Sequence, residues 1–255
     1  MWNDIKLLNA MASALVAATL LAVLGAGLWW VAHRPAFTLK SIRVEGVSQA
    51  PLRHVSTSTI RGTALPRIKG NFFTANLDSV RSAFESVPWV RRATVRRAWP
   101  NGLVVTVEEH QPLGTWGEDG RLLSVAGDIF TANLAEAEED GDLPSFTGPA
   151  GSEKEVVTRY RDFLQWFRGV NLKPASVSLS GRYAWSVKLS NGMTVELGRE
   201  QTRDTLKARV ERLVNIYPQL AARLQDRIES VDMRYPNGLA LKAHGLNLKQ
   251  ETKKK

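Results

Sequence analysis

Residues 88–109 read PWVRRATVRRAWPNGLVVTVEE, and this stretch decides the fold of the first soluble part of the chain. Its two halves are rich in β-branched residues and flank Pro100-Asn101-Gly102. Proline presets φ at a turn and glycine accepts a positive φ, so this tripeptide is typical of a tight connection between strands. The stretch therefore predicts a β-hairpin.

The segment before the hairpin adds a strand and two helices. Residues 37–47 alternate between apolar and polar side chains, as a half-buried strand does. Ser48 can cap a short helix that begins near Pro51. Residues 77–86 carry an apolar stripe at helical spacing, which Pro88 ends. The order strand–helix–helix–strand–strand predicts one small α+β module.

Several residues of this module form a more specific pattern. They are Gly70-Asn71-Phe72-Phe73, Leu77, Pro88-Trp89-Val90-Arg91, Ala93, Val95, Arg97, Trp99-Pro100, Leu103, Val105 and Glu109. In this pattern the module resembles the POTRA domain of the FtsQ/DivIB family of bacterial cell-division proteins. The resemblance implies a POTRA domain over residues 35–112. A bare POTRA topology would be less specific, because protein-translocation and outer-membrane assembly components share it.

The module follows an apolar segment, residues 10–32, that contains no charged side chain. As a helix it would be about 34 Å long, enough to cross a bilayer core of about 30 Å. Trp29 and Trp30 lie near its end, where indole rings prefer the water–lipid interface. The alternative is a cleavable signal peptide, but its apolar core is usually only about 7–15 residues long and its start more basic. We interpret residues 10–32 as an uncleaved transmembrane helix, which is also the layout of the FtsQ/DivIB family.

Small residues recur at every fourth position of this helix. Four of them are Ala14, Ala18, Ala22 and Ala26. Such a spacing lets a second transmembrane helix approach closely, so these alanines are candidates for helix–helix packing. The alternative is that alanine is simply common in such segments.

The flanking charges do not fix the orientation of the helix. One lysine precedes it, whereas Arg34, Lys40 and Arg43 follow it, so the positive-inside rule does not favour a cytoplasmic amino terminus. Residues 1–9 can hold no domain, however, so the folded mass follows the helix. Together with the resemblance, this predicts a short cytoplasmic tail, a single pass through the bacterial inner membrane and a periplasmic body at the division septum. The absence of cysteine fits an exported body but also occurs in other compartments.

Composition indicates a folded and basic protein. Hydrophobic residues make up 44% of the 255 residues and charged residues 23%, and the formal net charge is +9. Such a charge suits nucleic acid, anionic lipid or an acidic partner. Export of the body argues against nucleic acid.

The sequence predicts a second domain over residues 113–246 and a basic tail over residues 247–255. Two alternating runs flank Ser190-Asn191-Gly192 and predict another hairpin. We expect a mixed or antiparallel β domain with helices on one side, so that the whole chain is of the α+β class.

Two helices are predicted within this domain. Ser152 with Glu155 predicts a capping box at the start of the first. The second is predicted over residues 203–217, where Pro218 would stop it.

The resemblance continues into the second domain. Its motifs are Leu197-Gly198-Arg199, Ile216-Tyr217-Pro218-Gln219-Leu220 and Val231-Asp232-Met233-Arg234-Tyr235. In the family, the carboxy-terminal end of the β domain is an open sheet edge that takes a segment of FtsB, which is paired with FtsL. The resemblance implies that the binding residues here are Arg199, Arg234, Tyr235, Asn237, Gly238 and Ala240.

These residues have distinct expected roles. Tyr235 would be the aromatic anchor, and Arg199 and Arg234 would meet acidic groups on the partner. An exposed edge can bind an extended segment because its outward backbone N–H and C=O groups are unpaired. Pro236-Asn237 departs from some family members and is expected to shorten the edge strand, because proline cannot donate a hydrogen bond to a ladder. The alternative for Tyr235 is that it only packs in the sheet.

A second candidate surface lies on the first strand of the hairpin, where Arg92, Thr94 and Arg96 share one face. Residues 35–113 contain eleven Lys or Arg and five Asp or Glu, an excess of six positive charges. This face is a candidate docking surface for other division proteins, for an acidic partner or for anionic lipid. The alternative is that the arginines only flank a small core face.

No catalytic constellation is found in the sequence. The histidines, His33, His54, His110 and His244, are scattered, and there is no cysteine to complete a metal site. Glu108-Glu109-His110 could supply an acid and a base, but solvated residues at a strand end are the simpler interpretation. No phosphate-binding loop or dinucleotide fingerprint occurs. We therefore expect no enzyme activity, cofactor, metal, small-molecule substrate or nucleic acid.

The sequence and the resemblance together predict a non-catalytic membrane scaffold of the division machinery. It would link early, cytoplasmic-side division proteins to late ones through periplasmic contacts and help to control septal wall synthesis. One alternative is a protein-translocation or outer-membrane assembly component, which should carry several POTRA repeats or a β-barrel. Another is an anchored periplasmic hydrolase that draws paired carboxylates from distant positions.

Overall fold

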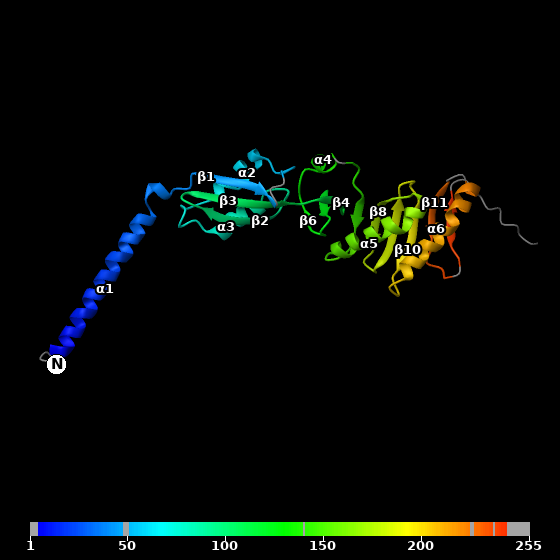
Figure 1. Ribbon diagram of the computed structural model, residues 1–255. Helices are drawn as coiled ribbons and strands as arrows, with labels where there is room; N and C mark the ends of the chain where they lie inside the picture. The colour runs from blue at the N-terminus through cyan, green and yellow to red at the C-terminus, as the bar shows by residue number, and fades with distance from the viewer. Residues whose placement is uncertain (1–4, 48–50, 140, 225–226, 237, 244–255) are drawn as a thin grey trace, which may run out of the picture. The chain divides into compact units, whose positions relative to one another are not determined.

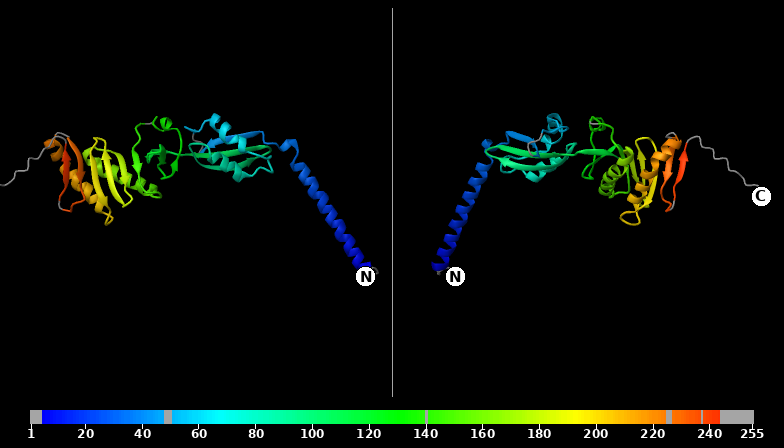
Figure 2. Two further views of the ribbon diagram at one scale, coloured as in Figure 1. Left: turned by 180° about the vertical axis from the view of Figure 1, so that it is seen from behind. Right: turned by 45° about the vertical axis from the view of Figure 1, so that its right-hand side comes forward.

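The computed structural model describes residues 5–47, 51–139, 141–224, 227–236 and 238–243 (Figures 1 and 2). The chain divides into two compact units, Met1–Glu109 and His110–Lys255. The expected Asn237 and His244 and the basic tail lie outside the described residues.

The first unit begins with a long helix, α1 (Ile5–Ala32), which starts before the predicted residue 10. None of its residues is buried. Among the described residues it is the one helix long and apolar enough to cross a membrane, with a mean hydropathy of 2.2 over its most apolar 18 residues. The Arg34 guanidinium lies 3.5 Å from the centre of the Trp30 ring, just beyond the end of the helix. A short 3-10 helix, η1 (Pro35–Phe37), follows.

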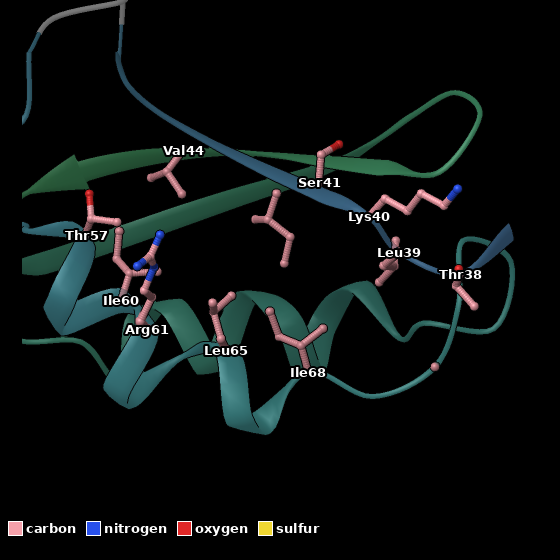
Figure 3. A pocket seen from close by; sticks show the side chains of 12 residues that line it. Thr38, Leu39, Lys40, Ser41, Val44, Thr57, Ile60, Arg61, Leu65 and Ile68 are labelled. Carbon is pink, nitrogen blue, oxygen red and sulfur yellow. The ribbon is translucent and has the colours of Figure 1, made fainter. Parts of the chain in front are cut away.

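The rest of the first unit has the predicted order strand–helix–helix–strand–strand. Its elements are β1 (Ser41–Gly46), α2 (Thr57–Thr63), the 3-10 helix η3 (Leu65–Arg67), α3 (Leu77–Glu85), β2 (Val90–Ala98) and β3 (Gly102–Glu109). The described strands form a three-stranded sheet in the order β1-β3-β2, with β1 parallel and β2 antiparallel to β3. The helices lie on one side of the sheet (Figure 3). Both β1 and β2 are therefore edge strands.

Alternation of side chains along these strands separates the core from the solvent-facing side. The helix-facing side holds the core of this unit. Its buried residues include Ile60, Val80, Phe84, Ala93, Leu103, Val105 and Val107. On β2 the side chains of Arg92, Thr94 and Arg96 are exposed, as their alternation with Ala93 predicted.

One predicted helix start in this unit is wrong. Helix α2 begins at Thr57, where the Ser56 side chain accepts a hydrogen bond from the Thr59 N–H, and not near Pro51. The reason is tertiary, because the backbone N–H groups of residues 53–55 donate to the Glu109 carboxylate instead of starting a helix. Ser48, the predicted cap, lies outside the described residues.

The second unit is a mixed sheet with helices packed on it. Its strands are β4 (Pro112–Trp116), β5 (Arg121–Ser124), β6 (Ile129–Phe130), β7 (Ser145–Thr147), β8 (Pro174–Leu179), β9 (Ala184–Leu189), β10 (Thr194–Arg199), β11 (Ile228–Asp232) and β12 (Ala240–Ala243). The described strands form one sheet in the order β12-β11-β10-β9-β8-β7-β4-β5-β6. Strand β7 is parallel to β4 and β8, β10 is parallel to β11, and the other neighbours are antiparallel.

Two long helices, α5 (Glu153–Trp166) and α6 (Thr205–Leu224), lie side by side against this sheet (Figures 1 and 2). A short α4 (Leu134–Ala137) and the 3-10 helix η4 (Phe167–Val170) complete the unit. The core between sheet and helices contains Phe146, Phe163, Phe167, Trp185, Met193, Leu197, Leu206 and Val231, all nearly or fully buried.

Two predictions about these helices are wrong. Helix α6 does not stop at Pro218 but runs through it to Leu224, because Leu220 and Leu224 continue the apolar stripe and pack against the core. Helix α5 begins after Ser152 as expected, yet the Ser152 hydroxyl donates to the Pro149 carbonyl instead of capping the helix.

Candidate partner-binding edge

The last described strand, β12, forms one end of the sheet of the second unit. It pairs antiparallel with β11, so that Asp232 lies opposite Ala240 and Val231 opposite Leu241. In the described part of the chain no strand pairs with the outer side of β12. Because backbone groups along a strand alternate in direction, every second residue of β12 presents its N–H and C=O outward. This is the arrangement that strand addition requires.

Strand β12 is short and carries charge. Lys242 on this strand makes an ion pair of 2.6 Å with Glu229 of β11, while its side chain remains 76% exposed. Lysine on an edge strand discourages indiscriminate pairing with other sheets. Leu239 and Leu241 pack partly against the core and hold the strand to the unit. The edge is thus anchored from one side and open on the other.

Arg234 lies just after β11 and is bound to its own chain. Its guanidinium donates to both carboxylate oxygens of Asp232, at 2.9 and 3.0 Å from Nε and 2.6 Å from Nη2. These hydrogen bonds hold the pKa of the Asp232 carboxyl below its usual value, although burial of Asp232 opposes the shift. Arg234 is still 61% exposed, so one face of its guanidinium can meet a partner.

A glycine makes room for the Arg234 side chain. Gly198 sits in an irregularity of the β9–β10 pairing with φ of +73°. A Cβ atom built on Gly198 would lie 2.8 Å from Cγ of Arg234. The Arg234 stem therefore crosses the backbone of β10 directly beside Arg199, which is exposed at the end of that strand.

The remaining predicted residues gather near the same edge. Tyr235 is 56% exposed and lies in the bend between β11 and β12, so it does not pack within the sheet. Gly238 is exposed, and a Cβ placed there would meet nothing within 4 Å. Ala240 is exposed at the start of β12. Asn237 lies outside the described residues, so its place in the site stays a prediction.

Two arginines of α6 hold the edge in place, and sequence reasoning did not find them. Arg209 donates from Nη1 to the carbonyls of Leu197, at 2.5 Å, and Arg199, at 3.0 Å. Burial is the main cause that lowers the pKa of its guanidinium. Arg212 donates to the carbonyls of Met233, at 3.2 Å, Tyr235, at 3.0 Å, and Pro236. The sequence feature that could have identified them is the spacing of three between Arg209 and Arg212, which places both beside the apolar stripe of α6.

The first unit offers a different surface. Arg92, Thr94 and Arg96 lie on the solvent-facing side of β2, opposite Glu108, Thr106 and Val104 of β3. Arg96 approaches Glu45 of β1 at 3.7 Å. This side of the sheet is thus a polar surface with charges of both signs, and its outer strand β2 is a second open edge among the described residues.

A groove lies on the other side of the first unit's sheet, along β1. It has a volume of about 660 Å³ and is lined on one side by Ile42 and Val44 and on the other by Ile60, Leu65 and Ile68 (Figure 3). No polar group of the described residues is buried in it without a partner. The groove is open, and its lining mixes these apolar side chains with polar ones, among them Thr38, Ser41, Thr57 and Arg61.

Comparison with known proteins decides the family of the chain. A profile for the FtsQ-type POTRA domain matches residues 37–110, and one for the C-terminal region of cell division protein FtsQ/DivIB matches residues 114–234. The chain is 53% identical to cell division protein FtsQ of Burkholderia pseudomallei (strain K96243) over 254 residues, which cover 100% of this chain and 99% of the relative. The chain belongs to the FtsQ/DivIB family.

Other relatives agree. The chain is 44% identical to cell division protein FtsQ of Bordetella pertussis, over 94% of this chain and 92% of the relative. It is 38% identical to cell division protein FtsQ of Nitrosospira multiformis, over 94% of this chain and 98% of the relative. The predicted family and α+β fold are confirmed.

Membership of the FtsQ/DivIB family defines the general role of the chain. The family consists of non-catalytic division scaffolds that interact with other division proteins, so the chain is not an enzyme. With helix α1, it is a single-pass membrane protein of cell division. This leaves the translocation and hydrolase alternatives without support.

The acidic residues considered for catalysis have structural roles. Glu109 accepts three backbone hydrogen bonds from residues 53–55, at 2.7 to 3.0 Å. Glu108 forms an ion pair of 2.6 Å with Arg91. His54 stacks on Trp89 and His110 on Phe130. Among the described residues, no cluster of His, Asp and Glu could hold a metal ion.

The four alanines of α1 lie on its exposed surface. Ala14, Ala18, Ala22 and Ala26 follow one another at every fourth position of an uninterrupted helix. None is buried within the chain, so their packing against another helix stays a prediction.

Proposed function

We propose that this chain binds an extended FtsB segment, presented by the FtsB–FtsL pair, through strand addition at the outer side of β12. The single observation that carries the proposal is the open edge of β12 next to the exposed Tyr235. Backbone hydrogen bonds along β12 would supply affinity, and the neighbouring side chains would select the partner. The role of FtsB and FtsL comes from the family resemblance.

The side chains around the edge divide the work of recognition. Tyr235 provides an exposed ring of low conformational entropy, the usual kind of interface anchor. Arg199 contributes an exposed cation, whereas the charge of Arg234 is already balanced by Asp232. We therefore expect Arg199 to contribute more than Arg234 to the attraction of an acidic partner. Arg234, held in place by Asp232, would instead position its guanidinium for hydrogen bonds to the partner.

The binding experiment has a matched control within the same unit. Tyr235→Ala and Tyr183→Ala each remove an exposed tyrosine, at 56% and 57% exposure. With the full-length chain in detergent or nanodiscs, we expect Tyr235→Ala to weaken binding of the periplasmic FtsB–FtsL pair by at least about tenfold, as loss of an interface hot spot does. Tyr183→Ala should leave the affinity unchanged. Equal affinities for both variants and the unchanged chain would reject the site.

The remaining parts of the scaffold proposal concern topology and further surfaces. We propose a cytoplasmic tail at residues 1–9, a transmembrane helix at 10–32, a POTRA domain at 35–112, a β domain at 113–246 and a basic tail at 247–255. The two compact units and the two profile matches support the limits proposed for the POTRA domain and the β domain. The β domain and the POTRA domain would then both face the periplasm, at the septum of the inner membrane.

Other division proteins would dock elsewhere on the scaffold. We assign one docking surface to Arg92, Thr94 and Arg96 of β2, which are exposed on an edge strand. Helix packing through the alanines of α1 would provide another. Through these contacts the chain would connect early and late division proteins and help to control septal wall synthesis. In cells depleted of the protein, Tyr235→Ala should fail to relieve filamentation while Tyr183→Ala relieves it.

A further inference from the structure

Three aromatic side chains from distant parts of the sequence form one exposed cluster in the first unit. The Phe37 ring lies 4.8 Å from Phe73 and 6.0 Å from Trp99, measured between ring centres. Trp99 is 71% exposed and Phe73 46% exposed. Phe72 is buried beneath them, with its ring centre 5.6 Å from that of Trp99. Large exposed aromatic rings that touch one another mark an interaction surface more than isolated ones do.

The chain places this cluster next to the membrane helix. Helix α1 ends at Ala32, and Phe37 closes the 3-10 helix that follows it. Arg34 and Phe37 are three positions apart, which is about 11 Å at most. The cluster segment is also tied back to the helix, because Asn71 Nδ2 donates to the Ala32 carbonyl at 2.7 Å.

The strands fix the cluster at one end of the sheet. Phe72 N–H donates to the Phe37 carbonyl, and Lys40 N–H donates to the Asn101 carbonyl in the β2–β3 turn. The start of β1 therefore lies beside this turn, which carries Trp99. Figure 3 shows Lys40 at this end of β1, where it lines the end of the groove. We name the cluster of Phe37, Phe73 and Trp99 the aromatic tip.

Charged residues are unevenly distributed along the sheet of the first unit, between the end with the aromatic tip and the opposite end. The segments that build the aromatic tip, residues 34–44, 64–77 and 86–107, contain no Asp or Glu. Exposed Lys40 and Lys69 lie on these segments. By contrast, Glu45, Glu108 and Glu109 are at the opposite ends of β1 and β3. The helix-proximal end thus combines apolar rings with exposed lysines, and these segments bring no carboxylate to it. At the far end the charges are of both signs, because Glu108 pairs with Arg91 and lies opposite Arg92.

We propose that the aromatic tip is a lipid-binding surface that rests in the interfacial layer of the bilayer crossed by α1, beside anionic headgroups. The amphipathic ring of Trp prefers this layer, Phe side chains bury apolar area at its boundary with the acyl chains, and lysines near the surface are attracted to anionic lipid. The headgroup region is about 5–8 Å thick on each side of the hydrocarbon core, within reach of the short connection after α1. Contact at the tip would limit the movement of the sheet and its helices, residues 41–109, about the short connection to α1. The proposal rests on α1 spanning a membrane and is independent of the partner at β12.

The test uses the full-length chain, which lacks cysteine, so single cysteines can be introduced and spin-labelled without other changes. One label goes at Asn101→Cys beside the aromatic tip, and a reference label at Arg92→Cys, about 20 Å away along β2. The protein is placed in nanodiscs of phosphatidylcholine and phosphatidylglycerol. We expect the ratio of collision rates with O₂ and with a water-soluble nickel chelate to be several-fold higher at position 101.

Substitution of the tip provides the decisive comparison. The double variant Phe73→Ser/Trp99→Ser should lower the ratio at position 101 to that of position 92, because both rings are exposed and their removal leaves no core cavity. Tyr183→Ser, which removes an equally exposed ring from the second unit, should leave it unchanged. A ratio at position 101 equal to that at position 92 in the unchanged chain would overturn the proposal, as would a high ratio that survives the double substitution. An unchanged signal at position 92 verifies that the double variant remains folded.

Discussion

The Cγ atom of Arg234 lies 2.8 Å from the place where a Cβ of Gly198 would be. Gly198 also has φ of +73°, in a region that side chains disfavour. The backbone of β10 at Gly198 therefore packs directly against the side chain of Arg234, which lies just after β11. The partner-binding edge is therefore a tertiary construction, although its residues were first recognised as a sequence motif.

Substitution of Gly198 by alanine should destabilise the second unit and also weaken partner binding. The positive φ costs about 1–2 kcal/mol for a residue with a side chain, and displacement of Arg234 adds to this. Gly192→Ala is the matched control, because Gly192 has φ of +86° but nothing within 4 Å of a Cβ. Denaturant unfolding should show a loss for both variants, and partner affinity should fall only for Gly198→Ala. A parallel fall for Gly192→Ala would contradict the role given to the Arg234 contact.

Removal of the Arg212 guanidinium should loosen the segment that carries Tyr235. Arg212→Met keeps the apolar stem but loses the hydrogen bonds to the carbonyls at residues 233, 235 and 236. We expect faster amide hydrogen exchange over residues 233–243 and a stability loss of about 1–3 kcal/mol. Lys207→Met, on the same helix, removes only an exposed ion pair of 3.8 Å and should change exchange little. Unchanged exchange in Arg212→Met would show that the segment is held by packing alone.

Much of the fold could be predicted from local sequence patterns. The β2–β3 hairpin and α3 were predicted within a few residues, because Pro100-Asn101-Gly102 and the apolar stripe act through neighbours in the sequence. The exposed face of Arg92, Thr94 and Arg96 also followed from alternation alone. Strand order did not, since the pairing of β1 with β3 joins residues about sixty positions apart.

The candidate edge was only half predictable for the same reason. Tyr235 and Arg199 could be named from motifs, but Arg209 and Arg212 act on carbonyls that only the folded sheet brings to α6. The stop assigned to Pro218 was wrong because a proline penalty of about 3 kcal/mol is smaller than the gain from continued packing of the stripe. Pro218 is itself exposed.

The Asp232–Arg234 pair should make the second unit sensitive to acid. The pKa of Asp232 is lowered, first by the hydrogen bonds from Arg234. Its contribution is therefore complete above the ordinary value of 3.8 and is lost as the pH falls below it through the lowered pKa. The stability difference between the unchanged chain and Asp232→Asn should be constant from pH 7 to about 5 and shrink below about 4, as urea unfolding can measure. A difference as large at pH 2.5 as at pH 7 would contradict this linkage.

Glu109 should matter to stability far more than Glu108, although the two are adjacent at the end of β3. Glu109→Gln replaces a carboxylate that accepts three backbone hydrogen bonds from residues 53–55 with a neutral amide. We therefore expect the free energy of unfolding to fall by about 1–3 kcal/mol. Glu108→Gln removes an ion pair whose side chains are 32% and 38% exposed, worth at most about 1 kcal/mol. Hydrogen exchange at residues 53–55 should accelerate only in Glu109→Gln. If both variants lost the same stability, the carboxylate would not be what holds this segment out of helix α2.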